Sequence, residues 1–122
     1  DARIEFVTAD LFHLPQAWIE AFDLVVESQT VQALPPSLRE EVIAQVVSLV
    51  APGGTLIVQA VAASEGETQE GPPWPLTRAV IDQFAARLDP ADISRIPAPG
   101  QPTFHRWRAE FRRPSEPRSK SE

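Results

Sequence analysis

The fold is decided by residues 22–61, which read FDLVVESQTVQALPPSLREEVIAQVVSLVAPGGTLIVQAV. Two apolar runs in this stretch, at 22–27 and 55–61, have the length and the β-branched content of strands. Leu24–Val26 show no alternation between apolar and polar residues. We therefore expect the first strand to be buried on both faces, as in a parallel sheet that helices cover.

A helix is expected between these two strands, after the proline pair at 35–36. Ser37 and Glu40 have the spacing of a capping box, in which a hydroxyl and a carboxylate each satisfy a free backbone N–H. Apolar residues then recur every three or four positions. Residues 51–54, Ala-Pro-Gly-Gly, end the helix, since proline cannot continue it and glycine accepts a left-handed cap. The order strand, helix, strand predicts a right-handed βαβ unit with parallel strands.

The glycine pair at 53–54 does not predict a phosphate-binding loop. Such loops lead from a strand into a helix, whereas this pair leads from a helix into a strand. We interpret it as a turn.

Further elements flank the central unit. Residues 4–10 alternate at their start and predict a short strand. Residues 62–75 are small, acidic and proline-rich, which is typical of an exposed loop, and a helix capped by Thr77 follows them. A short strand over 92–97 and a strongly alternating strand over 105–112 predict an antiparallel hairpin at the end of the sheet.

Composition restricts the class of protein. The 122 residues are enough for one domain, which we place at 1–113, with a disordered tail rich in proline, serine and charge at 114–122. Without cysteine there are no disulfides and no thiolate metal sites. His13 follows Asp10 by three residues, but no third metal ligand is evident. No apolar run is long enough to cross a membrane and no signal peptide is evident, so we expect a cytoplasmic protein.

The charge is unevenly distributed along the chain. The formal net charge is -6, with -9 on residues 1–105 and +3 on residues 106–122. A basic end is one feature of nucleic-acid binding. Here half of the basic residues alternate along a strand, and the acidic remainder of the domain would repel phosphates. We therefore expect no nucleic-acid partner.

Several of these segments together resemble class I S-adenosylmethionine-dependent methyltransferases. Residues 8–12 (TADLF), 22–27 (FDLVVE) and 49–56 (LVAPGGTL) resemble the third, fourth and fifth strand motifs of that family. The later hairpin matches the family's antiparallel end. Residues 27–36 and 72–77 are similar to a bacterial small-molecule branch related to thiopurine methyltransferases. The resemblance implies an α/β fold: a partial Rossmann-like sheet of parallel strands with helices and an antiparallel carboxyl-terminal hairpin.

The resemblance covers about residues 3–113 and implies the carboxyl-terminal half of an enzyme that transfers a methyl group from S-adenosyl-L-methionine to a small-molecule acceptor. The family's first strand, its Gly-rich loop and the acid after its second strand have no counterpart here. The family places its third strand beyond the first two, so the expected strand at 4–10 has no neighbour unless a missing amino-terminal half or a second copy supplies one. We therefore expect this chain alone to bind the donor poorly and to be inactive.

The resemblance also implies site residues at the carboxyl ends of the strands, where open α/β sheets bind ligands. Asp10 and Leu11 correspond to the acid and the backbone N–H that meet the adenine, and a carboxylate suits the adenine amino group because it accepts hydrogen bonds. Asp10 could instead cap the turn after a strand. Glu27 and Ser28 are further candidate contacts to the donor, with Glu27 equally explained as a strand-end acid in water. Gln32 is a candidate contact to the acceptor or an exposed turn residue.

Trp74, in the proline-rich loop, is a candidate lid over the substrate or a residue that holds the loop to the surface. Phe12 is expected in the core rather than on the adenine. We predict no catalytic base, because in-line methyl transfer depends chiefly on positioning.

Two other hypotheses remain open. A fragment of a nucleotide-binding oxidoreductase would have a further parallel βαβ unit after Val61, where this sequence has a hairpin. A non-catalytic α/β association module would form a stable oligomer that is indifferent to the donor.

Overall fold

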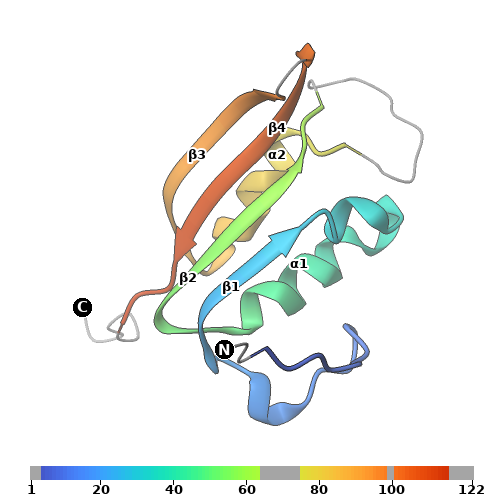
Figure 1. The fold of residues 1–122 in the computed structure, drawn as a ribbon. Helices are drawn as coiled ribbons and strands as arrows, with labels where there is room; N and C mark the ends of the chain where they lie inside the picture. The colour runs from blue at the N-terminus through green and yellow to red at the C-terminus, as the bar shows by residue number, and fades with distance from the viewer. Residues whose placement is uncertain (1–3, 64–74, 99–100, 116–122) are drawn as a thin grey trace.

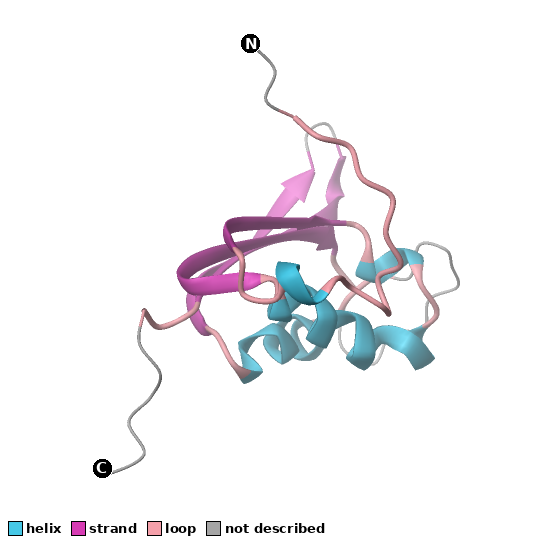
Figure 2. Ribbon diagram, turned by 90° about the horizontal axis from the view of Figure 1, so that it is seen from below, coloured by secondary structure: helices cyan, strands magenta, loops and turns pink. Residues whose placement is uncertain are grey.

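The computed structural model describes residues 4–63, 75–98 and 101–115, which form one sheet with helices on one of its faces (Figures 1 and 2). The four strands lie in the order β1-β2-β4-β3, with bounds β1 Phe22–Ser28, β2 Val50–Val61, β3 Asp89–Ala98 and β4 Gln101–Arg112. The α-helices are α1 Arg39–Ser48 and α2 Arg78–Asp82. Short 3₁₀ helices are η1 Gln16–Trp18, η2 Val31–Ala33, η3 Pro36–Leu38 and η4 Gln83–Ala86. No helix in these described ranges is both long and apolar enough to cross a bilayer.

The strand pairing confirms the predicted topology. β1 and β2 are parallel and are joined through α1, as a βαβ unit requires. β4 then pairs antiparallel with both β2 and β3. The α/β class and the antiparallel hairpin are therefore as predicted.

The core lies between the sheet and the helices. The predicted alternation in β4 is confirmed, since its apolar members face the helices and Arg106, Arg108 and Arg112 are exposed. Phe84 and Phe111 stack with their ring centroids 5.8 Å apart. The main buried side chains are Val42, Ile43, Val46 and Val47 of α1, Leu56 and Val58 of β2, Ile81 and Phe84 of the α2–η4 segment, and Trp107, Ala109 and Phe111 of β4.

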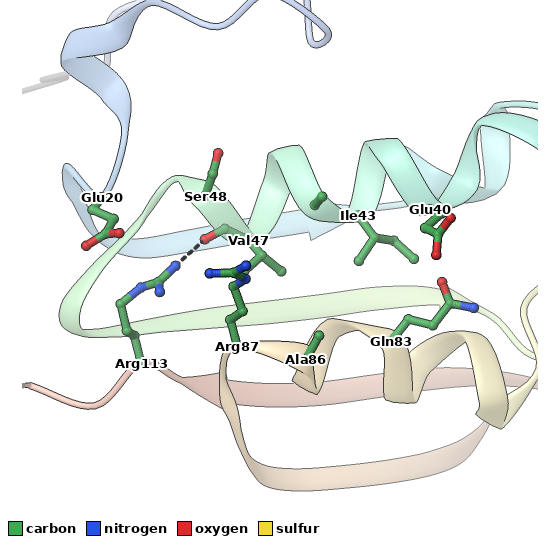
Figure 3. Close-up of a pocket in the computed structure, with 10 residues that line it drawn as sticks. Glu20, Glu40, Ile43, Val47, Ser48, Gln83, Ala86, Arg87 and Arg113 are labelled. Atoms are coloured by element: carbon green, nitrogen blue, oxygen red, sulfur yellow. Dashed lines mark hydrogen bonds between the residues drawn. The ribbon is translucent and has the colours of Figure 1, made fainter. Parts of the chain in front are cut away.

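Arg113, just after β4, closes the carboxyl-terminal end of α1 (Figure 3). Its Nη2 donates to the carbonyl of Val47 at 2.8 Å and its Nε donates to the carbonyl of Val50 at 2.7 Å. The last carbonyls of a helix lack their regular partners, so the bond to Val47 satisfies one at the end of α1. The bond to Val50 reaches the first residue of β2, so Arg113 holds the end of α1 to the sheet.

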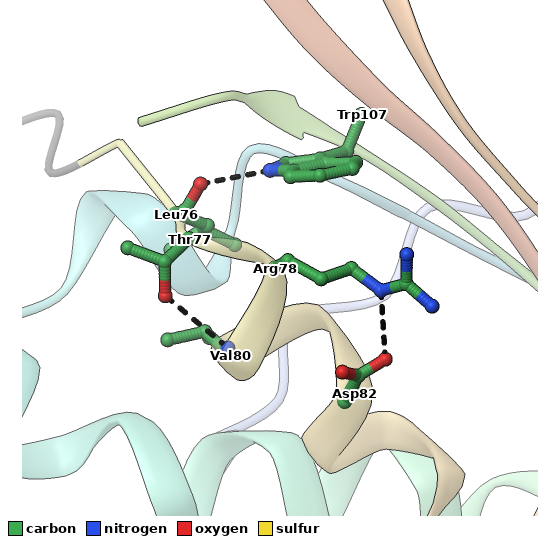
Figure 4. Close-up of polar contacts among 6 residues, drawn as sticks. All are labelled: Leu76, Thr77, Arg78, Val80, Asp82 and Trp107. Atoms are coloured by element: carbon green, nitrogen blue, oxygen red, sulfur yellow. Dashed lines mark hydrogen bonds and ion pairs between the residues drawn. The ribbon is translucent and has the colours of Figure 1, made fainter. Parts of the chain in front are cut away.

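The segment that enters α2 is held to the sheet in a similar way (Figure 4). Trp107 Nε1 donates to the carbonyl of Leu76 at 2.8 Å, in a buried contact. Thr77 caps α2 as predicted, because its Oγ1 accepts the N–H of Val80 at 3.4 Å. These contacts fix the helix start against β4.

Two strand predictions are wrong. Residues 4–10 form no strand, and their side chains are exposed. They pair with none of the four described strands, so their backbone groups have no partner in this sheet. β1 is an edge strand and is not buried on both faces: Leu24 is 59% exposed and Val26 is 58% exposed. The reason is that the described helices cover only one face of the sheet (Figure 2).

The predicted capping box is also wrong. Ser37 lies inside the 3₁₀ turn η3, and the residue before α1 is Leu38, without a side-chain cap. Pro36 starts this turn, and its fixed φ favours a helical start without a polar cap. Glu40 lies in the first turn of α1, where its charge is favourable to the helix dipole.

The glycine pair lies within β2 rather than in a turn before it. β2 begins at Val50, and its register with β1 shifts between the pairs that involve Phe22 and Leu24. Gly53 has φ +79°, which glycine adopts without strain. The pair is therefore an irregularity inside the strand.

Candidate functional site

A shallow hollow of about 500 Å³ lies beside the carboxyl end of β1. Two segments that are distant in the sequence form it: residues 9–12, and four residues of the turn after β1, which are Gln29, Thr30, Ala33 and Leu34. We call it the β1-end hollow. Open α/β sheets bind ligands outside the carboxyl ends of their strands, so this hollow is the candidate site.

Asp10 stands at the rim of this hollow and caps the local turn. Its Oδ1 accepts the N–H of Phe12 at 2.9 Å, and its Oδ2 lies 2.9 Å from Nδ1 of His13. The hydrogen bond from Phe12, aided by His13, lowers the pKa of the Asp10 carboxyl below its ordinary value. The group is therefore a charged acceptor, and each of its oxygens keeps a second lone pair for a ligand.

Leu11 presents a backbone donor beside this carboxylate. No hydrogen-bond partner for its N–H is found within the described residues. The side chains of Leu11 and Phe12 are half-buried and pack against the core. Both residues also line the β1-end hollow, so the placement of Phe12 in the core rather than on the adenine stays a prediction. Asp10 and Leu11 thus offer an acceptor and a donor side by side.

Glu27 is buried, and the view of it as a strand-end acid in water is wrong. The residue is 3% exposed and its Oε1 accepts the N–H of Thr30 at 2.6 Å. Its Oε2 is buried and has no partner in the described part of the chain. Burial raises the pKa of Glu27, against the opposing effect of hydrogen bonds from Thr30 and Val31. Ser28, the next residue, is exposed at the end of β1.

Gln32 is also buried, so the interpretation as an exposed turn residue is wrong. Its Oε1 accepts the N–H of Val61 at 2.7 Å, while Nε2 has no partner in the described ranges. Neither Glu27 nor Gln32 is among the residues that line the β1-end hollow. Trp74 lies outside the described residues.

The structure therefore brings Asp10 and Leu11 together with the turn after β1. Thr30, Ala33 and Leu34 line the hollow but were not singled out from the sequence. The signal that could have indicated them is their position, since they directly follow a strand that ends at the ligand-binding edge.

A second groove, of about 400 Å³, lies between α1 and η4 (Figure 3). Ile43, Val47 and Ala86 give it apolar walls, and Arg87 and Arg113 stand at one end. It is formed by the helices and not by the carboxyl ends of the strands.

Comparison with known proteins agrees with this architecture. The family model for thiopurine S-methyltransferase (TPMT) matches residues 1–92. A search of curated proteins found no match. Among solved structures, the chain is similar to the Burkholderia thailandensis 1,6-didemethyltoxoflavin-N1-methyltransferase, with a TM-score of 0.73 at 17% identity, covering 92% of this chain and 52% of that one.

Two further structures show the same fold. The N-methyltransferase NodS from Bradyrhizobium japonicum has a TM-score of 0.69 at 19% identity, covering 93% of this chain and 56% of that one. The [4+2]-cyclase SpnF has a TM-score of 0.73 at 16% identity, covering 93% of this chain and 57% of that one. The chain thus spans somewhat more than half the length of these proteins. Its fold is the Rossmann-like fold of methyltransferases, and, because the family model matches most of its residues, the chain belongs to the thiopurine S-methyltransferase family.

Proposed function

We propose that this chain supplies part of the donor site of an enzyme that transfers a methyl group from S-adenosyl-L-methionine to a small-molecule acceptor. The observation that carries the proposal is the β1-end hollow, where Asp10 and Leu11 stand beside the carboxyl end of β1. Family membership and the fold support the same reaction class.

The residues at the rim fit the adenine end of the donor. The adenine amino group donates hydrogen bonds, which the Asp10 carboxylate can accept. A ring nitrogen can accept a hydrogen bond from the N–H of Leu11, for which the described residues offer no other acceptor. Ala33 and Leu34 offer apolar surface to a flat ring across the hollow. When bound, S-adenosylmethionine supplies a methyl group on a positively charged sulfur, which a nucleophile can displace. The part of these residues is to bind and orient, which in-line displacement chiefly requires.

We infer further that residues outside this chain complete the pocket. The chain covers 52% to 57% of the methyltransferase-fold structures described above. Phe22, Leu24 and Val26 expose a strip of apolar surface on β1, which a further strand or helix would cover. A second copy of the chain is the rival occupant of this strip.

The acceptor is proposed to be a small molecule. The similar Burkholderia structure contains 1,6-didemethyltoxoflavin and S-adenosylhomocysteine, and the NodS structure contains S-adenosylhomocysteine. SpnF, described as a cyclase, has the same fold, so the reaction has to be tested directly.

Calorimetric titration of S-adenosylmethionine tests the proposal. The chain is compared with a polypeptide extended by the upstream coding sequence. We expect binding heat only from the extended polypeptide, because we propose that the family's Gly-rich loop and ribose-binding acid lie outside this chain. Equal tight binding by both would contradict the incomplete pocket, and no binding by the extended polypeptide would contradict the donor site.

The Asp10→Asn variant of the extended polypeptide tests the role of the carboxylate. A charge-assisted hydrogen bond is lost, so we expect affinity for S-adenosylmethionine to fall about tenfold. Asp23→Asn is the matched control, because Asp23 is an exposed acid outside the hollow. If both variants bind as the parent does, Asp10 does not contact the donor.

A further inference from the structure

The turn that leaves β1 forms one wall of the β1-end hollow and is held by two buried side chains. Glu27 accepts the N–H of Thr30 at 2.6 Å, which ties the turn back to β1. Gln32 accepts the N–H of Val61 at 2.7 Å, which ties the same turn to the end of β2. Between them Gln29 has φ +65°, and its N–H donates to the carbonyl of Gln59 at 3.0 Å.

Glu27 and Gln32 hold the turn, but their burial costs folding free energy. Glu27 Oε2 and Gln32 Nε2 are buried without a partner in the described residues, and an unpaired buried polar atom lowers stability. Burial also raises the pKa of Glu27, so the fold disfavours its charged form. Apolar side chains of similar volume often replace buried charged groups without loss of stability. Stability of the fold alone therefore does not account for this pair.

The geometry points to a function in the site. We propose that Glu27 and Gln32 are positioning residues, which hold Thr30 and the residues up to Leu34 opposite residues 9–12 and so set the width of the β1-end hollow for a flat heteroaromatic ring. The identity of that ring as adenine rests on the proposed function. The positioning itself rests on the two hydrogen bonds, which belong to the chain alone.

Glu27→Gln and Glu27→Leu separate the hydrogen bond from the volume of the side chain. The glutamine keeps an oxygen that can accept the N–H of Thr30, whereas leucine removes it. By amide hydrogen exchange on the chain, we expect the Thr30 amide to exchange about tenfold faster in Glu27→Leu than in the parent, and at the parent rate in Glu27→Gln. Gln32→Leu and Gln32→Glu are the corresponding pair for the Val61 amide.

Ile81→Val is the control for a general loss of stability, because Ile81 is fully buried in α2 and does not line the hollow. It should not accelerate exchange at Thr30 selectively. A Thr30 amide that exchanges equally fast in the parent and in Glu27→Leu would show that the hydrogen bond to Glu27 does not hold the turn. The Val61 amide tests the hydrogen bond to Gln32 in the same way.

The same variants in the extended polypeptide test the effect on the ligand. We expect Glu27→Leu to weaken S-adenosylhomocysteine binding about tenfold and Glu27→Gln to restore the parent affinity. If the Thr30 amide exchanges faster in Glu27→Leu while the affinity for S-adenosylhomocysteine is unchanged, Glu27 has no positioning role, and the proposed donor site is unaffected. If the extended parent polypeptide binds no S-adenosylhomocysteine, the proposed function is contradicted. The exchange rates of the Thr30 and Val61 amides would still decide whether Glu27 and Gln32 hold the turn.

Discussion

Replacing Gly54 with alanine should disturb the start of the β1–β2 pair. A Cβ at this position would lie 2.9 Å from the carbonyl oxygen of Ala51, 3.0 Å from that of Phe22 and 3.1 Å from that of Asp23. All three atoms belong to the backbone, so none can move aside by a rotamer change. The strands themselves have to shift.

The expected cost follows from this crowding. Overpacking a well-packed interior costs about 1–3 kcal/mol, and we expect about 3 kcal/mol here because backbone must move. Gly53→Ala is the matched control. Its Cβ would meet Ser115 at ordinary contact distances, 3.6 Å from Cβ and 3.9 Å from Cα, so its cost comes from φ +79° and should be about 1 kcal/mol.

Urea unfolding of the parent and both variants, followed by circular dichroism, measures these costs. Gly54→Ala should have the lowest midpoint and Gly53→Ala an intermediate one. The reasoning would be refuted by a Gly54→Ala variant as stable as the parent, or by Gly53→Ala being the less stable of the two.

Three further predictions follow. Trp107→Phe removes one of two donors to the carbonyl of Leu76, the other being the N–H of Ala63, and should lower the free energy of unfolding by about 1 kcal/mol in urea; an unchanged midpoint would show that the 2.8 Å contact of Trp107 contributes nothing. Burial raises the pKa of Glu27, so the folded protein loses stability as the pH rises from about 4.5 through the pKa of the folded state. Glu27→Gln should therefore melt at a higher temperature than the parent near neutral pH and lose this advantage in acid. Equal melting temperatures of the two proteins at every pH would contradict this prediction. Leu24→Lys combined with Val26→Lys charges the exposed strip on β1 and should reduce self-association in sedimentation velocity; a parent chain that is monomeric at all concentrations would exclude a second copy as the occupant.

Local sequence patterns were sufficient to predict the βαβ unit and the antiparallel hairpin. The βαβ unit and the hairpin follow from the periodicity of the sequence, because helix and strand periods are properties of neighbouring residues. The alternation over β4 placed Trp107 and Phe111 correctly in the core.

Features that depend on distant segments were not predictable in this way. Residues 4–10 have the composition of a strand but find no pairing partner in the part of the chain that the structure describes, and strand partners come from distant segments. Leu24 and Val26 have the composition of a doubly buried strand, yet the described helices cover only one face. Neither outcome is encoded in the local pattern.

The candidate site was partly predictable. Resemblance to a family placed Asp10 and Leu11 at a strand end, and they do line the β1-end hollow. The burial of Glu27 and Gln32 was missed, because it depends on the turn folding back until Thr30 and Val61 reach the two side chains.

The most direct test of the account is amide chemical-shift mapping of the extended polypeptide as S-adenosylhomocysteine is added. The account predicts that, within the present chain, the largest shifts fall on residues 9–12 and 29–34 around the β1-end hollow. Shifts that gather instead at the groove between α1 and η4, with residues 9–12 unchanged, would contradict it.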